Sequence, residues 1–243
     1  MLETFPKSIV LYNIVGVSNT GLMRFDAAIE AYKEALKIKP DYSEVYNNMG
    51  TAQNGKGDPE TAMACFQQAV LINPDYAEAY NNIGLAFSVK GKIKAAITNY
   101  EKALKIDPDY ADAHNNMAIA LQKKGDLKGA IESYNKVVLI QPHSAEAYYN
   151  MGIAYKGLDN TEAAIGSYKQ AIKINPHYVE AFINIGIVLK DSGHHEAAIN
   201  SYKQALNIKP DYADALFNMG VSLQDLGDLQ GAISSYNKAV SIK

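Results

Sequence analysis

Small and aromatic residues recur along this chain at helical spacing. One example is Ala96, Tyr100 and Ala103, which stand four and three residues apart among mostly polar positions. Residues three and four apart share one face of a helix, so this spacing predicts an amphipathic helix with that face buried. The aromatic position of the pattern occurs seven times, at Tyr32, Phe66, Tyr100, Tyr134, Tyr168, Tyr202 and Tyr236. The pattern therefore predicts an all-α protein built from copies of one unit.

Proline marks the length of the unit. Pro40, Pro74, Pro108, Pro142, Pro176 and Pro210 follow one another at intervals of 34 residues, and Pro6 extends the series backwards. A fixed period of this size is typical of a stacked repeat array. With each proline at position 32, the seven units are 9–42, 43–76, 77–110, 111–144, 145–178, 179–212 and 213–243. Residues 1–8 are interpreted as the tail of a further unit upstream.

Each unit is expected to hold two helices joined by a turn. The first should start at an aspartate N-cap with an acid three residues later, as in Asp75 and Glu78, and end near a glycine that takes the left-handed conformation. The second should start after a capping residue such as Asp58, with Pro59 at its first position. It should end two residues before the proline, as at Ile106. The other capping pairs predicted for the first helix are Asp41 with Glu44, Asp109 with Asp112, and Asp211 with Asp214; the other caps predicted for the second are Asp126, Asn160 and Asp228.

A small residue on the first helix of each unit, such as Gly84, allows the second helix to approach closely. With this residue, the Ala–aromatic–Ala series and the closing proline, the chain resembles the tetratricopeptide repeat family. The resemblance covers 9–243 and departs from the pattern at Ile14, where later units have asparagine, and at Met23 and Asp159, which replace the inter-helix glycine. It implies a right-handed superhelix of seven helix-turn-helix repeats, whose first helices line a concave groove.

One asparagine in each of six units has no obvious role in the helix pair, because asparagine is a mediocre helix former. A side-chain amide can both donate to and accept from the backbone of an extended peptide, so these residues are candidates for peptide binding. The alternative is a hydrogen bond between neighbouring repeats, and both can hold. The row resembles the ladder on the repeat half of O-GlcNAc transferase and Spindly-type glycosyltransferases, which grips the substrate polypeptide. The ladder asparagines are Asn48, Asn82, Asn116, Asn150, Asn184 and Asn218.

Apolar residues three positions after the ladder asparagines fall on nearly the same helix face. Leu85, Ile119, Ile153 and Ile187 are therefore further candidates for peptide binding, with packing between repeats as the alternative. Acids four positions before the ladder either edge the groove or favour the helix dipole in the first turn. These acids are Glu44, Glu78, Asp112, Glu146, Glu180 and Asp214.

Composition excludes several other functions. The 23 lysines and arginines against 26 acids give a net charge of −3, so neither nucleic acid nor a membrane surface is an expected partner. The absence of a long apolar run or signal-like start favours a cytoplasmic protein. Cys65 has no nearby histidine, and the adjacent His194 and His195 do not share a helix face. No cofactor, metal site or catalytic residue is expected, and the single arginine, Arg24, disfavours the carboxylate-clamp type of repeat protein.

The sequence thus predicts a non-enzymatic module that binds extended protein segments. Two alternatives stay open. The chain could be the substrate-recruiting arm of a larger glycosyltransferase or similar enzyme, or a scaffold that self-associates through its ends or convex faces. In the second case the last helix would expose the surface that a further repeat would cover.

Overall fold

The computed structural model describes residues 8–242. Within that range the chain forms fourteen α-helices and no strand, which confirms the all-α prediction. The helices are α1 (Ile9–Gly21), α2 (Phe25–Ile38), α3 (Ser43–Lys56), α4 (Pro59–Ile72), α5 (Ala77–Val89), α6 (Ile93–Ile106), α7 (Ala111–Lys124), α8 (Leu127–Ile140), α9 (Ala145–Gly157), α10 (Thr161–Ile174), α11 (Val179–Asp191), α12 (His195–Ile208), α13 (Ala213–Asp225) and α14 (Leu229–Ser241).

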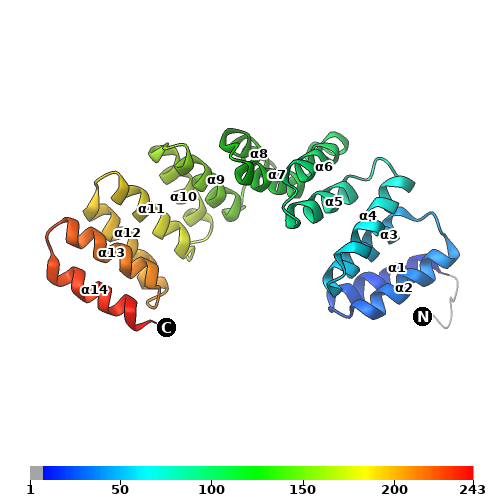
Figure 1. Cartoon of the computed structure of the whole chain (residues 1–243), viewed down its shortest axis with the longest axis horizontal. Helices are drawn as coiled ribbons and strands as arrows, with labels where there is room; N and C mark the ends of the chain where they lie inside the picture. Colours follow the sequence, from blue (N-terminus) through cyan, green and yellow to red (C-terminus); the bar gives the residue numbers. More distant parts are fainter. Residues whose placement is uncertain (1–7, 243) are drawn as a thin grey trace. The chain divides into compact units, whose positions relative to one another are not determined.

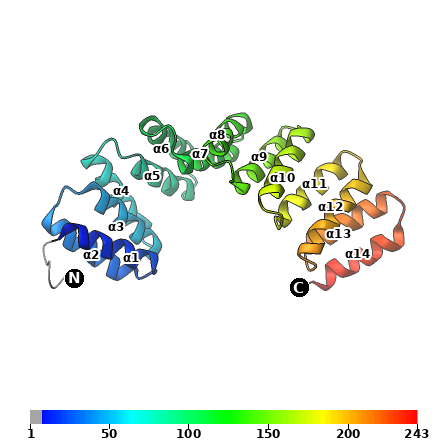
Figure 2. The same cartoon turned by 180° about the vertical axis from the view of Figure 1, so that it is seen from behind.

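The chain divides into two compact units, residues 1–124 and 125–243. In unit 1, α1 pairs with α2, α3 with α4, and α5 with α6, and each hairpin packs on the next helix along the chain (Figure 1). Unit 2 repeats the arrangement with α9 and α10, α11 and α12, and α13 and α14, as the view from behind also shows (Figure 2). Packing of each hairpin on its neighbours in sequence is the organisation of a repeat array.

The turns between paired helices follow the sequence pattern closely. Gly57, the C-cap of α3, has φ 91°, and Gly91, Gly125, Gly193 and Gly227 also lie in the left-handed region. Met23 and Asp159 occupy the corresponding turns with φ 57° and 56°. These two side chains therefore hold a backbone conformation that costs a non-glycine residue about 1–2 kcal/mol.

Replacing Met23 or Asp159 with glycine is expected to stabilise the chain by about 0.5–1 kcal/mol each, because glycine adopts the left-handed conformation without the Cβ penalty. Neither site offers a strong opposing loss, since Met23 and Asp159 are both exposed. Thermal denaturation followed by circular dichroism would measure the change. Gly91→Met is the reverse substitution at an equivalent turn, and a destabilisation by Met23→Gly would contradict the assignment of strain.

The second helix of each hairpin has the predicted ends. The side chains of Asp58, Asp126, Asn160 and Asp228 accept hydrogen bonds from the backbone N–H three residues later, and Pro59 begins α4. The last residues are the predicted isoleucines, from Ile38 in α2 to Ile208 in α12. Arg24, Lys92 and His194 stand at the remaining N-caps and make no capping side-chain bond.

The predicted N-caps of the first helices are wrong. α5 begins at Ala77 with Tyr76 at its N-cap, one residue after the expected Asp75, and α3 and α13 begin after Tyr42 and Tyr212 in the same way. Asp75 instead lies in the turn, where its backbone N–H donates to Asn73 Oδ1 over 3.1 Å. Asp75 is therefore part of the turn after the proline, and the N-cap of the helix is the next residue, Tyr76. α7 likewise begins at Ala111, two residues after the predicted cap Asp109.

The small position on the first helix sets the distance between paired helices. A Cβ added at Gly84 would stand 2.5 Å from Cε1 of Tyr100 and 3.1 Å from the carbonyl oxygen of Ala96. Gly50 meets Phe66 and Gly152 meets Tyr168 in the same way. Each aromatic ring therefore contacts the glycine backbone directly, and Ala96 and Ala103, which flank Tyr100 on α6, are fully buried. This close packing fixes how each first helix presents its remaining faces.

Candidate functional site: the asparagine ladder

All six ladder asparagines are half-buried on first helices of the hairpins. Asn48, Asn82 and Asn116 lie on α3, α5 and α7 in unit 1, and Asn150, Asn184 and Asn218 lie on α9, α11 and α13 in unit 2. We call the ladder asparagines of a unit, with the apolar candidates three residues further on, its ladder surface. It consists of Asn48, Asn82, Asn116, Leu85 and Ile119 in unit 1, and of Asn150, Asn184, Asn218, Ile153 and Ile187 in unit 2.

In unit 1 the ladder amides bond to the preceding repeat. Nδ2 of Asn48 donates to Oδ1 of Asn13 over 3.1 Å, and Nδ2 of Asn82 donates to Oδ1 of Asn47 over 2.9 Å. Asn116 makes the same bond to Asn81 over 3.0 Å. Each bond joins residues 35 positions apart, so a second row of asparagines, on the first helix of the preceding repeat, accepts the hydrogen bonds of the ladder. We call this second row the receiving row. The inter-repeat role considered as the alternative is therefore present in unit 1.

The acids in the first turn complete this hydrogen-bonded group. Asn47 Nδ2 donates to Oε1 of Glu78 over 3.0 Å, and the Tyr76 hydroxyl donates to Oε2 of the same carboxylate over 3.4 Å. Burial, and then the nearby carboxylates Glu78 and Glu44, raise the pKa of the Tyr76 hydroxyl, which keeps it protonated as a donor. Glu78 thus holds the neighbouring repeat besides standing in the first turn of α5.

The same group occurs at the first junction and is shortened at the third. At the first, Asn13 Nδ2 donates to Glu44 over 2.8 Å and the Tyr42 hydroxyl donates to the same carboxylate. At the third, the acid is Asp112, one methylene shorter than glutamate, and it makes no hydrogen bond to Asn81 in the described structure. The bond from the receiving asparagine to the acid thus occurs at the first two junctions of unit 1, where the acid is glutamate.

In unit 2 the receiving row changes. Asn184 Nδ2 donates to the hydroxyl of Tyr149 over 2.9 Å, and the Tyr149 ring stacks on Tyr178 with centroids 4.9 Å apart. Asn218 has Ile183 at the receiving position and donates instead to the backbone oxygen of Asp214 on its own helix over 2.8 Å. An isoleucine offers no acceptor, so this amide turns back to its own helix.

The apolar candidates divide between exposed and packed positions. Leu85 is 41% exposed and Ile153 is 39% exposed, which leaves them available to a ligand. Ile119 and Ile187 are half-buried, and Ile187 packs against the core cluster around Tyr202. Packing is therefore observed for Ile187, whereas peptide binding at the exposed positions stays a prediction.

Sequence reasoning missed the receiving row. Its members are Asn13, Asn47 and Asn81 in unit 1 and Tyr149 in unit 2. The doubled asparagines at 47–48 and 81–82 were the available signal, because adjacent residues lie on different helix faces and two in-phase rows imply two neighbours.

The cysteine and histidines considered in the sequence analysis do not form a catalytic or metal-binding group among the described residues. Burial raises the pKa of the Cys65 thiol to about 11, so the nucleophilic thiolate is scarce at neutral pH. His195 Nδ1 lies 3.5 Å from Oδ2 of Asp225, across one repeat junction. Among residues 8–242, no three histidines, cysteines or acids are placed to hold a metal ion.

Two further observations bear on possible partners, one on membrane spans and one on the exposed side of α14. None of the described helices is long and apolar enough to cross a membrane. On α14, Ile233 is 52% exposed, whereas its counterpart Ile199 on α12 is 6% exposed. Self-association through this end stays a prediction.

Sequence comparison places the repeats in a known family. Tetratricopeptide-repeat profiles match residues 24–57, 55–88, 89–125, 123–159 and 188–227, and two further profiles of this kind match 145–178 and 213–243. These matches cover most of the chain, and the chain belongs to the tetratricopeptide repeat family. No curated protein sequence is significantly similar to it.

Several solved structures are similar to this chain. MamA is 33% identical, with 65% of this chain and 92% of that chain covered and a TM-score of 0.62. A MamA fragment from Desulfovibrio magneticus RS-1 is 23% identical, with 69% and 95% covered and a TM-score of 0.65. YrrB, described as a TPR protein with an unusual peptide-binding site, is 24% identical, with 78% and 97% covered and a TM-score of 0.69. The all-α repeat fold is thereby confirmed.

Proposed function

We propose that this chain is a protein-interaction module without catalytic activity, and that its ladder surfaces bind extended peptide segments. The observation that carries the proposal is the hydrogen-bonding capacity left on the ladder amides of unit 1. An asparagine amide has two N–H donors and an oxygen with two lone pairs. Asn82 uses one N–H towards Asn47, and no described residue donates to its Oδ1.

The inter-repeat bond and a ligand bond are therefore compatible on one side chain. The bond to the preceding repeat fixes the rotamer of Asn48, Asn82 and Asn116, so their remaining N–H and oxygen are held at one position in each repeat. A side chain that is already ordered loses less conformational entropy on binding. YrrB supports the reading at the level of the fold, since that protein is described as having a peptide-binding site.

Exposed apolar side chains beside the amides suit a peptide ligand. Leu85 and Ile153 offer contact area three residues after Asn82 and Asn150. Backbone bonds to the amides would give sequence-tolerant affinity, and these apolar residues would select the side chains of the ligand. The ladder is equally compatible with a free-standing module and with the substrate-recruiting arm of a larger glycosyltransferase. The second of these stays a prediction.

The test is a pair of triple variants in the full chain. Asn48→Ala, Asn82→Ala and Asn116→Ala together remove the ladder amides of unit 1. At about 0.5–1.5 kcal/mol per bond, the loss of three bonds should lower affinity for a peptide selected from a random library on the parent chain by about 10- to 2000-fold. Fluorescence anisotropy with the labelled peptide measures the loss.

The matched control removes the receiving row instead. Asn13→Ala, Asn47→Ala and Asn81→Ala break the same three inter-repeat bonds but keep the ladder amides. Both triple variants should lose stability, and only the ladder variant should lose affinity to the stated extent. Equal loss of affinity in the two variants would show that the asparagines act only between repeats, and the proposal would fail.

A further inference from the structure

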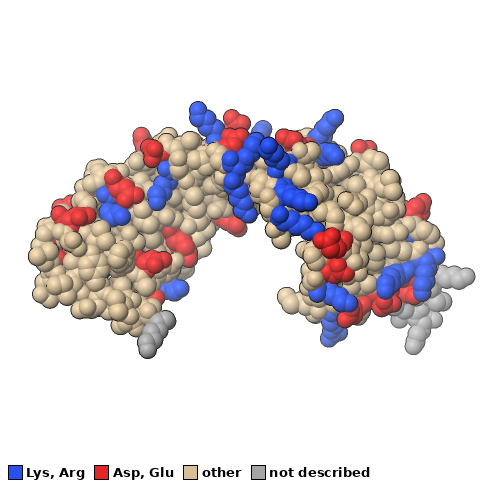
Figure 3. Space-filling model, in the orientation of Figure 1, with Lys and Arg blue, Asp and Glu red and all other residues tan. Residues whose placement is uncertain are grey.

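The turns between paired helices carry an uneven distribution of charge. Residues 88–96, around the α5–α6 turn, contain Lys90, Lys92 and Lys94 and no acid. The equivalent residues 54–62, 156–164 and 190–198 each contain one lysine and two acids. The end of α7 adds Lys123 and Lys124. In a chain with a net charge of −3, five lysines of unit 1 thus stand around these two turns, and basic side chains, drawn in blue, are seen over α5–α7 in Figure 3. We call Lys90, Lys92, Lys94, Lys123 and Lys124 the lysine edge.

Two of these lysines stand where the fold favours acids. Lys92 is the N-cap of α6 and makes no capping bond, whereas Asp58 at the same position of the preceding repeat caps α4. Lys94 lies in the first turn of α6, where α4 has Glu60. A helix N-terminus carries partial positive charge and unpaired N–H groups, so both lysines oppose the local electrostatics.

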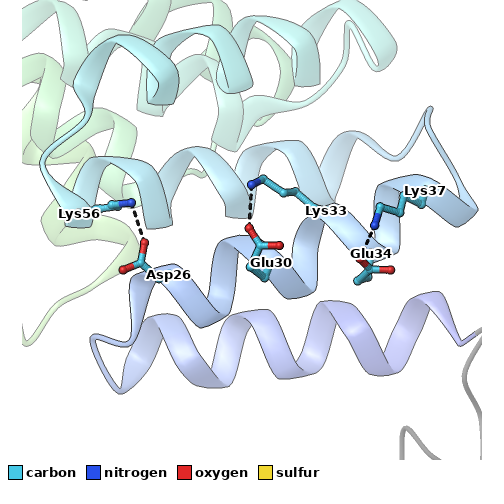
Figure 4. A network of polar contacts seen from close by, with 6 residues as sticks. All are labelled: Asp26, Glu30, Lys33, Glu34, Lys37 and Lys56. Carbon is cyan, nitrogen blue, oxygen red and sulfur yellow. Dashed lines mark hydrogen bonds and ion pairs between the residues drawn. The ribbon is translucent and has the colours of Figure 1, made fainter.

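The junction between repeats shows a second conflict. In the first two junctions, residues 30 positions apart form ion pairs: Asp26 with Lys56 over 2.6 Å (Figure 4), and Glu60 with Lys90 over 2.5 Å. The same register at the third junction places Lys94 with Lys124. Two like charges therefore occupy a position that holds an ion pair at both earlier junctions. A bound anionic group would supply the negative charge that an acid supplies at the two earlier junctions.

We propose that the lysine edge binds an acidic segment of a protein partner. Exposed lysines are flexible point charges, which suit the separated carboxylates of an acidic peptide. The edge lacks arginine, whose planar guanidinium pairs with phosphate through two hydrogen bonds. Residues 88–96 also contain no aromatic side chain on which a base could stack. The ligand class is therefore the acidic polypeptide, bound at a surface distinct from the ladder.

The variant Lys92→Asp with Lys94→Glu tests the proposal in the full chain, with opposite expectations for stability and binding. Lys92→Asp supplies the missing N-cap, and Lys94→Glu restores the ion-pair register with Lys124, so the melting midpoint should rise. The probe is a fluorescein-labelled peptide of alternating glutamate and serine. Its affinity, measured by anisotropy, should fall about tenfold or more and should weaken with added salt in the parent chain.

Matched controls separate a local site from the effect of net charge. Lys169→Glu with Lys203→Glu makes the same charge-for-charge exchange at exposed positions of α10 and α12 and should leave affinity unchanged. A peptide with glutamine in place of glutamate should not bind. Equal binding by the edge variant and the parent, or equal loss in the α10–α12 control, would overturn the proposal. Tighter binding of oligothymidylate or of vesicles containing phosphatidylserine than of the acidic peptide would also overturn it, in favour of another polyanion.

Discussion

Tyr168→Ala is expected to lower the free energy of unfolding by about 3–5 kcal/mol. The ring is fully buried, lies against the backbone at Gly152 and contacts the ring of Tyr149 at 5.8 Å between centroids. Because Gly152 has no side chain to move into the space, alanine would leave a cavity that the hairpin cannot close without bringing α9 and α10 together. Denaturant unfolding followed by circular dichroism measures the loss.

Tyr168→Phe is the matched control. The Tyr168 hydroxyl is buried without a hydrogen-bond partner in the described structure, and burial raises its pKa. Removing an unsatisfied hydroxyl should leave stability unchanged or raise it by about 1 kcal/mol. Phe66 already occupies the same position in another repeat. If phenylalanine cost as much as alanine, the hydroxyl rather than the ring would be the stabilising group.

Asn47→Ala is expected to destabilise the chain by about 1–3 kcal/mol, although alanine is the better helix former. Asn47 is fully buried, accepts from Asn82 and donates to Glu78, so one substitution breaks two hydrogen bonds between α3 and α5. The change should appear as a lower denaturation midpoint with little change in helix content.

A double-mutant cycle isolates the bond between the two rows. Asn82→Ala alone and together with Asn47→Ala should give a coupling energy of about 0.5–1.5 kcal/mol. Asn218→Ala serves as a comparison, because that amide bonds only to its own helix and should cost little. Additive effects of Asn47 and Asn82 would contradict the inter-repeat bond.

The helix pair could be predicted from sequence because its determinants are local. The cap at Asp58, the left-handed turn at Gly57 and the helix end at Ile106 depend on backbone rules that act within a few residues. The small residue at Gly84 and the ring at Tyr100 repeat with a fixed period, which is typical of a stacked repeat array. Because the pattern occurs in seven copies, the helix bounds predicted for one unit also apply to the others.

The site could be predicted only in part, because its determinants lie one repeat away. Whether a ladder amide bonds to the preceding repeat or to its own helix depends on the residue 35 places earlier, as the contrast between Asn82 and Asn218 shows. The N-cap at Asp75 was misplaced for a local reason, since Asp75 belongs to the turn after Pro74, where its backbone N–H donates to the side chain of Asn73. The conflict between Lys94 and Lys124 became visible only after ion pairs at the earlier junctions had set the register.

The receiving row also makes the order of the repeats matter. A copy of residues 43–76 placed before another repeat offers Asn47 as an acceptor to any incoming ladder asparagine. A copy of residues 179–212 offers Ile183, and the incoming amide must turn back to its own helix, as Asn218 does. Units that look interchangeable in their helices are therefore directional at their borders. Growth of such an array by duplication, or its shuffling by design, is limited by which unit is placed upstream.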